Sequence, residues 1–377
     1  MKISVKMIDT AFSGQRCYTH ARGAFAPDGF GVITTQPLRL SGSDIFYGVH
    51  VLKTSDGGES WSDIMPCKNL GRQSLADGSE RVIADGTPFY HKKSGKILLI
   101  GTEVFYENDE AAGPRESRAL YSIYDRESGE FSELRTFELP QLGDEYFCCV
   151  CGSTQCFEEE SGDILLPVMH YSLRTAENLW QGFISSSVIR AGFDGERLYF
   201  KEIGAPLTLN IPRGLYEPSI MRFGGKYYLC MRGDTDGYIA SSSDGLNFGE
   251  PRALVFDDGE SVGNYNTQQH WIRLQDKLFL VYTRRGANND HVFRHRAPLF
   301  IAEVDTEKLC LIRHTERVAV ECRGARLGNF GCAEVGENLA RVIVSEWMQG
   351  PNGGGESYKE CMKYGSNNSI FISEISL

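Results

Sequence analysis

The sequence predicts an all-β fold, a six-bladed β-propeller of four-stranded antiparallel blades. Three observations support this prediction. Segments with one common plan recur along the chain, a second turn motif follows in several of them, and no Pro/Ser-rich or low-complexity run divides the 377 residues. We therefore expect a single domain over residues 1–377.

The repeated plan is a hairpin. Each segment begins with small or polar residues, continues with a short apolar run, passes a turn that contains Gly or Asp, and ends with a second apolar run. The starts lie roughly fifty to sixty-five residues apart, which suits one four-stranded blade with its connections. The six segments are 20–36, 85–101, 151–168, 216–231, 266–283 and 328–347.

A second motif falls where a four-stranded blade needs its outer turn. It is complete in TSDGGESW (54–61), shortened in SSDGLNF (242–248), and reduced to an acid before an apolar anchor after Tyr124, Phe193 and Val304. In such a turn the Asp side chain accepts hydrogen bonds from backbone N–H groups, and Gly supplies a positive φ. These acids are predicted to be structural.

The two ends of the chain are expected to close the ring. Residues 3–9 (ISVKMID) and 369–377 (SIFISEISL) both read as strands. Pairing them in the last blade joins the first and final blades and removes an exposed sheet edge.

Composition excludes several classes of partner. The formal net charge is −11, and an acidic field repels nucleic acid and anionic membranes. The start MKISVKMIDT lacks the apolar core of a secretory signal, and no later segment has the length of a membrane span. We expect a soluble, cytoplasmic protein with no nucleic-acid or membrane partner; the oligomeric state is not predicted.

No cofactor or metal is expected either. The eleven cysteines lie mostly in apolar runs, which suits reduced thiols. The cluster CCVCGSTQC (148–156) has no matching second pair and no flanking histidine. His291 and His295 are four residues apart, but their segment reads as loop and strand and lacks an HExxH acid.

The starts of the inner strands converge on the axis of a propeller, so their polar side chains reach a shared cavity. Side chains that hydrogen-bond with fixed geometry are what a polyhydroxylated sugar needs. The alternative is that they bond to a central column of water or belong to the core. The candidates at these starts are His20, Arg22, Asp85, Thr87, Thr154, Gln155, Gln268, Gln269, His270, Asn329 and Phe330.

The segment YEPSIMRFGGKYYLCMRG (216–233) contains Glu217-Pro218 and then Arg232, and Asp244 of the shortened turn motif follows it. In this order and spacing the chain resembles the sialidase superfamily of Asp-box propellers, and the resemblance covers nearly the whole chain. It implies that Glu217 lies at the mouth of the central funnel and that Arg232 grips a substrate carboxylate. The alternative is a buried ion pair that only closes the blade.

The resemblance implies further site residues. Asp44, in the loop RLSGSDIFYG, is the candidate proton donor, with a turn-forming role as the alternative. Arg296 or Arg294 is the candidate second carboxylate clamp, with a solvated basic loop as the alternative.

Two departures argue against strict exo-sialidase activity. The chain has His20 near the place where the family has the first of its arginines. It also has Asn329 and Phe330 where the family has its nucleophilic tyrosine. Without that tyrosine, a retaining mechanism loses its attacking group.

We therefore expect a glycoside hydrolase acting on an acidic or deoxy sugar, a small carbohydrate substrate. One alternative is a lyase that β-eliminates a uronate with His20 or a tyrosine as base, and another is a non-catalytic propeller that binds glycan or protein. The predicted catalytic residues are Glu217, Asp44 and His20. The predicted substrate-binding residues are Arg232, Arg296, Arg294, Arg22, Asp85, Gln155, Gln268, His270 and Asn329.

Overall fold

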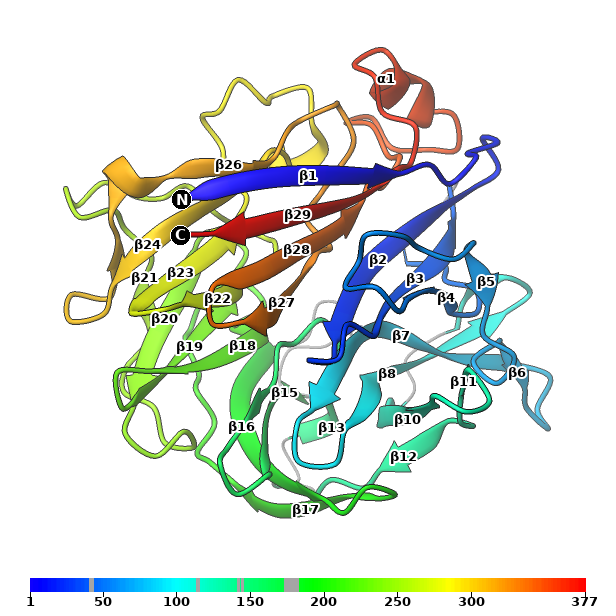
Figure 1. The fold of residues 1–377 in the computed structure, drawn as a ribbon, viewed down its shortest axis with the longest axis horizontal. Coiled ribbons are helices and arrows are strands. Elements are labelled where there is room, and N and C mark those ends of the chain that lie inside the picture. Colours follow the sequence, from blue (N-terminus) through cyan, green and yellow to red (C-terminus); the bar gives the residue numbers. More distant parts are fainter. Residues whose placement is uncertain (41–43, 113–115, 141–142, 144–145, 173–182) are drawn as a thin grey trace.

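The computed structural model describes residues 1–40, 44–112, 116–140, 143, 146–172 and 183–377. Over these residues almost all regular structure is strand, and the only α-helix is α1 (Tyr358–Met362). The strands form small antiparallel sheets in a β-propeller arrangement (Figure 1). The all-β prediction and the propeller arrangement are confirmed.

Hydrogen bonding groups the described strands into six sheets. The first contains β2 (Arg16–Phe25), β3 (Gly31–Arg39), β4 (His50–Thr54) and β5 (Met65–Pro66). The second contains β6 (Gln73–Ser74), β7 (Glu80–His91), β8 (Lys96–Glu107), β9 (Glu110–Ala111), β10 (Ala119–Asp125), β11 (Glu130–Phe131) and β12 (Arg135–Phe137). The third contains β13 (Tyr146–Val150), β14 (Phe157–Glu158), β15 (Ile164–Ser172), β16 (Phe183–Phe193) and β17 (Leu198–Ile203).

The fourth contains β18 (Tyr216–Phe223), β19 (Lys226–Arg232), β20 (Gly237–Ser242) and β21 (Arg252–Ala253). The fifth contains β22 (His270–Leu274), β23 (Lys277–Tyr282), β24 (Leu299–Asp305), β25 (Cys310–Leu311) and β26 (Arg317–Val320). The sixth contains β1 (Lys2–Ile8), β27 (Gly331–Gly336), β28 (Leu339–Ser345) and β29 (Ile370–Ser376). Two 3-10 turns, η3 (Phe293–His295) and η4 (Arg313–Thr315), lie in the loops of the fifth.

The sheets are not uniformly four-stranded, which corrects the prediction for the second, third and fifth sheets. In the second sheet β7 and β8 are each 12 residues long, well beyond the usual strand of about 5–6 residues. Their extra length leaves unpaired backbone that the short strands β6 and β9 cover.

Apolar clusters lie between sheets that follow one another along the chain. One cluster, for example, joins Ile220 of β18 and Leu229 of β19 to Leu165 of β15. Another packs Ile33 of β3 against Ile372 of β29, and so joins the first sheet to the sixth. Since burial of apolar surface is the main force that holds sheets together, these clusters bring the inner strands of all the sheets around one centre.

The two ends of the chain lie in one sheet. β1 pairs with β29 in antiparallel register from Lys2 with Ser376 to Ile8 with Ile370, and Figure 1 shows the two strands side by side. The N-terminal strand is therefore an edge strand of this sheet, and the C-terminal strand lies between it and β28.

The acids of the outer turns bond within their own loops. Asp56 accepts hydrogen bonds from the Ser60 backbone N–H at 3.0 and 3.1 Å. Asp244 accepts from the N–H groups of Leu246 and Asn247 at 2.9 and 2.8 Å. Hydrogen bonds to the ionised carboxylate lower the pKa of Asp56, those from Ser60 most of all. These acids stabilise turns and do not face the centre.

Eleven cysteines are present, and each is a free thiol. No helix in the described part of the chain is long and apolar enough to cross a membrane.

Candidate functional site

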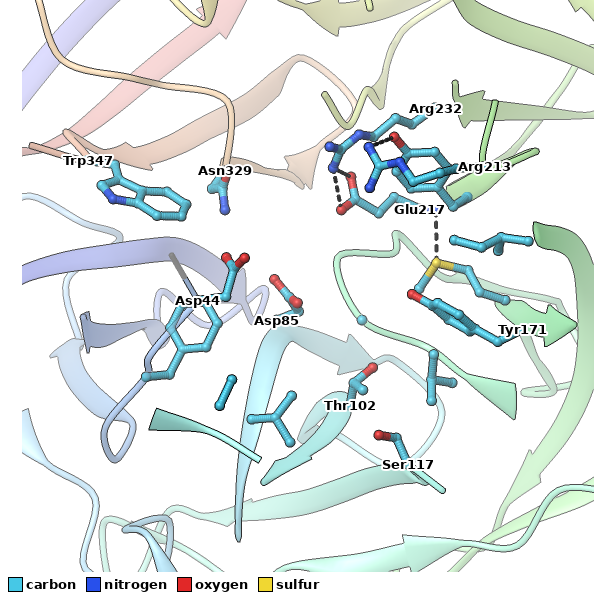
Figure 2. A pocket seen from close by; sticks show the side chains of 18 of the residues that line it. Asp44, Asp85, Thr102, Ser117, Tyr171, Arg213, Glu217, Arg232, Asn329 and Trp347 are labelled. Carbon is cyan, nitrogen blue, oxygen red and sulfur yellow. Dashed lines mark hydrogen bonds and ion pairs between the residues drawn. The ribbon is translucent and has the colours of Figure 1, made fainter. Parts of the chain in front are cut away.

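A cavity of about 470 Å³ opens where the starts of the inner strands meet. Seven predicted site residues line it: Asp44, Asp85, Glu217, Arg232, Arg294, Arg296 and Asn329. Figure 2 shows the carboxylates of Asp44 and Asp85 on one side of the open space and the Glu217–Arg232 pair on the other. The structure thus brings together residues from distant parts of the chain.

Three of the inner strands contain a bulge at the residue that reaches the centre. His20, Asp85 and Glu217 have left-handed φ values of 54°, 54° and 47°, and the strand register shifts at each of them. A residue with a Cβ is strained in this region, and such strain is often found at functional sites. Ser153 and Asn266, with φ of 56° and 48°, repeat the feature ahead of β14 and β22.

Glu217 and Arg232 form an ion pair in the wall of the cavity. Both carboxylate oxygens of Glu217 lie 2.7 Å from Nη1 of Arg232, while Nη2 of Arg232 donates to Oδ1 of Asn266. Burial by itself would lower the pKa of Arg232, but the charge of Glu217 raises it above its usual value. Arg232 therefore stays charged.

Arg213 stands beside this pair and has no sequence motif to reveal it. Its Nε donates to Asp234 at 2.8 Å, and its Nη2 donates to the hydroxyl of Tyr216 at 2.6 Å. The Tyr216 ring lies between Arg213 and Arg232, with centroid distances of 4.8 and 4.6 Å to the two guanidinium carbons. Tyr216 is thus held as a structural support for two cations.

Three further arginines line the same side of the cavity: Arg294, Arg296 and Arg326. Among the residues that the structure describes, none of the three forms an ion pair with a carboxylate. Burial and the charges of neighbouring arginines lower the pKa of Arg294 and Arg296, and burial lowers that of Arg326 to about 9. This side of the cavity therefore holds more positive charge than the ion pairs of the described residues neutralise. Arg326 was not predicted, because it stands in a loop without a motif.

Hydrogen bonds of Asn289 and His295 stabilise the loop that carries Arg294 and Arg296. Nδ2 of Asn289 donates to the backbone oxygens of Arg284 and Ala297 at 2.9 and 2.6 Å. The ring of His295 bonds to Tyr265 through Nδ1, at 2.5 Å, and to Asp290 through Nε2, at 3.2 Å. Arg294 and His295 both have left-handed φ, of 54° and 52°, so these contacts stabilise a strained turn.

His20 lies directly behind the lining residues. Its Nε2 is 3.1 Å from Oδ1 of Asp85 and also contacts the amide of Asn329, while Phe46 packs on the ring. Burial lowers the pKa of His20 well below its usual value. The imidazole is therefore neutral at neutral pH, and Asp85 orients it.

Asp44 lines the cavity from an exposed position with a φ of 61°. Its backbone oxygen accepts a hydrogen bond from the Tyr106 hydroxyl at 2.6 Å, which anchors the loop at this point. Three serine and glycine positions before it, 41–43, lie outside the described residues.

The opposite wall of the cavity is largely apolar, with Val104, Phe105, Val150, Met169 and Ile184 among its members. Tyr171 also belongs to it, and Figure 2 shows its hydroxyl directed toward the open space. Burial raises the pKa of Tyr171, so the phenol keeps its proton near neutral pH and can donate a hydrogen bond.

Comparison with known proteins identifies the fold. No family model and no curated protein matches the sequence. A Trypanosoma rangeli sialidase, solved with the inhibitor DANA, matches with a TM-score of 0.64 at 12% identity over 98% of this chain and 59% of that one. The fold is sialidase-like. A Hadza microbial sialidase also matches this sialidase-like chain, with a TM-score of 0.63 at 11% identity over 96% of this chain and 66% of that one.

A protein of unknown function from Dyadobacter fermentans matches the sialidase-like chain over 99% of both chains, with a TM-score of 0.64 at 15% identity. The chain spans less than two thirds of the length of the Trypanosoma and Hadza sialidases.

Four predicted substrate-binding residues of this sialidase-like protein do not line the cavity: Arg22, Gln155, Gln268 and His270. Arg22 donates to the backbone oxygens of Asp85 and Phe330 at 2.8 and 3.1 Å, and its Nη2 bonds Gln268. Gln155 bonds both backbone groups of Trp271. Their polar atoms connect sheets near the axis, which is the alternative that the sequence left open.

A buried core residue, Phe330, occupies the position where a tyrosine was expected. Phe330 is fully buried and packs edge-on against His270, with ring centroids 4.9 Å apart. Within the described ranges, no group of three His, Cys, Asp or Glu side chains has the arrangement of a metal site.

Proposed function

We propose that this chain is a glycoside hydrolase that acts on an acidic sugar in the central cavity. We also propose that the chain forms a single domain of six blades, one for each sheet. One observation carries the proposal. Arg294, Arg296 and Arg326 line the cavity without carboxylate partners among the described residues, and acids line the same cavity. Guanidinium groups in a partly dry site bind a carboxylate or ester oxyanion strongly, in planar, two-point geometry.

The roles of the acids follow from their surroundings. Asp44 is exposed on the cavity rim, where substrate and water can reach it, and it is our candidate for the acid that protonates the departing oxygen. Glu217 is fixed in position by Arg232, which suits a group that stabilises the positive charge of an oxocarbenium-like transition state or activates water. His20 and Asp85 orient Asn329 toward the sugar.

A covalent intermediate on tyrosine is not part of this proposal. The hydroxyl of Tyr216 is engaged by Asp234 and Arg213, and Phe330 stands where the family has its tyrosine. Tyr171 keeps its proton. Water is therefore the nucleophile that the cavity best accommodates.

β-Elimination on a uronate is the second candidate. Its supporting observation is that His20 is neutral, because burial lowers its pKa, and is oriented by Asp85 as a base would be. Arginines would then neutralise the carboxylate next to the proton that leaves.

The test is a panel of aryl glycosides and oligosaccharides of acidic sugars. Hydrolysis releases a reducing sugar, and Asp44→Asn and Glu217→Gln are each expected to reduce it by a factor of about 10² or more. Asp63→Asn, at an exposed position outside the cavity, is the control. An unsaturated, ultraviolet-absorbing product would favour elimination, and tight binding without turnover would favour a binding propeller.

A further inference from the structure

The arginine side of the cavity carries more positive charge than one acid group neutralises. Five arginines line it: Arg213, Arg232, Arg294, Arg296 and Arg326. Two of them have protein partners, since Arg232 pairs with Glu217 and Arg213 pairs with Asp234. The other three have no carboxylate partner in the described part of the chain.

Asp44 acts on two of these three arginines, and Glu217, which is already paired with Arg232, acts on Arg296. Asp44 lines the same cavity and interacts electrostatically with Arg294 and Arg326. Even if the charge of Asp44 offsets one guanidinium fully, two positive charges are left over. Asp85 contacts the neutral His20 and Ser153, and its charge acts on the buried Arg22.

Burial makes this excess costly in the absence of a ligand. Arg296 and Arg326 are only 3% and 4% exposed, so water screens their charges poorly. Their hydrogen bonds are also incomplete. Arg296 uses Nη2 on the backbone oxygen of Asn266 and Arg326 uses Nη1 on Gln349, while Nε of each has no partner.

A ligand with a single carboxylate would leave one of these guanidinium groups without a counter-charge. We infer that the ligand of this cavity carries two negative charges, as does a phosphorylated sugar or a uronate that also bears a sulfate ester. This inference rests on the proposed function, because it takes the cavity to be the substrate site.

The experiment compares ligands of one and two charges by titration calorimetry on the whole chain. Glucuronate is the probe with one charge, and glucuronate 2-sulfate and glucose 6-phosphate are the probes with two at about pH 8. Inorganic phosphate against acetate tests the charge without a sugar. Glucuronate 2-sulfate and glucose 6-phosphate are each expected to bind at least about tenfold more tightly than glucuronate, and phosphate at least about tenfold more tightly than acetate. The affinity of each dianion is also expected to fall more steeply as salt is added. Which ester binds more tightly identifies the second anion.

Arg294→Gln is the informative variant, since Arg294 is exposed and makes no side-chain hydrogen bond to another described residue. It is expected to weaken dianion binding about tenfold and to weaken monoanion binding much less. Arg252→Gln removes the same charge from an exposed position outside the cavity and is expected to change neither.

Equal affinity for monoanions and dianions, equal effects of the two variants, or no binding of any probe would overturn the inference. Cleavage of a simple glucuronide without preference for dianions would leave the proposed function intact and end this inference. Tight dianion binding without cleavage of any glycoside would support this inference and contradict the proposed function.

Discussion

Both carboxylate oxygens of Glu217 lie 2.7 Å from the same Nη1 atom of Arg232, so one ion pair joins the start of β18 to the end of β19. The side chains are only 19% and 10% exposed. In such a pair the loss of one partner leaves the other charged and buried, which costs more than the loss of both.

Glu217→Ala is therefore expected to lower the free energy of unfolding by about 3 kcal/mol, because Arg232 is left unpaired. The double variant Glu217→Ala/Arg232→Met is expected to lose less than this single variant. Urea unfolding at neutral pH measures both. If the double variant loses as much as the sum of the two single variants, the pair has no coupling and this account is wrong.

Arg22 is predicted to hold the sheets together, not to bind substrate. It is fully buried, and its guanidinium bonds to the backbone of Phe330, to the backbone of Asp85, and to Ser153 and Gln268, which lie in other repeats. Arg22→Met leaves these carbonyl groups unsatisfied and is expected to cost about 3–5 kcal/mol in urea unfolding.

Arg16→Met, at an exposed position of the same strand, is the matched control and is expected to cost under about 1 kcal/mol. A stable Arg22→Met protein that binds anions less tightly than the wild type would return Arg22 to the binding site.

Buried histidines are predicted to make the fold sensitive to mild acid. Burial lowers the pKa of His270 to about 3 and of His170 to about 4, whereas in the unfolded chain each is near 6.5. Below about pH 6.5 the unfolded chain binds protons that the folded chain excludes. Stability is therefore full above that pH and is lost as the pH falls, at about 2 kcal/mol per histidine by pH 5.

The variant His270→Gln is expected to lose less stability between about pH 7.5 and 5 than the wild type, when both are unfolded in urea. His314→Gln, at an exposed position, is expected to follow the wild type. Parallel curves for all three proteins would show that His270 has no part in the acid sensitivity.

The hydroxyl of Tyr265 is predicted to fix the position of the loop that carries Arg294 and Arg296. It lies 2.5 Å from Nδ1 of His295, which is the neighbour of Arg294 in a left-handed turn. Tyr265→Phe removes this bond alone. It is expected to weaken phosphate binding about threefold to tenfold while lowering the free energy of unfolding by only about 1 kcal/mol.

Tyr199→Phe, an exposed tyrosine of β17, is the control for loss of a hydroxyl. A fall in stability with unchanged phosphate affinity would mean that Tyr265 supports the fold and not the position of Arg294.

Much of the fold could be predicted because its signals are local. Alternating apolar runs around a Gly or Asp turn are enough to define a hairpin, and each of the predicted segments contains an antiparallel strand pair. The turn acids could also be predicted from the sequence, because an Asp that accepts hydrogen bonds from N–H groups two to four residues away needs no distant partner.

The residues that line the cavity could be predicted from the sequence only in part. Glu217 and Arg232 belong to one hairpin, so the sequence alone placed them together. Arg326 and Arg213 stand in loops that no motif marks, and they join the cavity only when the sheets pack. Arg22 was predicted to face the cavity, but two residues beyond the bulge at His20 its side chain reaches between sheets.

The sequence by itself determined the strands, their turns and the hairpin that carries the central ion pair, because these depend on neighbours along the chain. The tertiary structure alone decided which polar side chains face the open centre and which bond between the sheets. A bulge changes the face to which a side chain points, and the sheets that meet around the cavity come from residues tens to hundreds of positions apart.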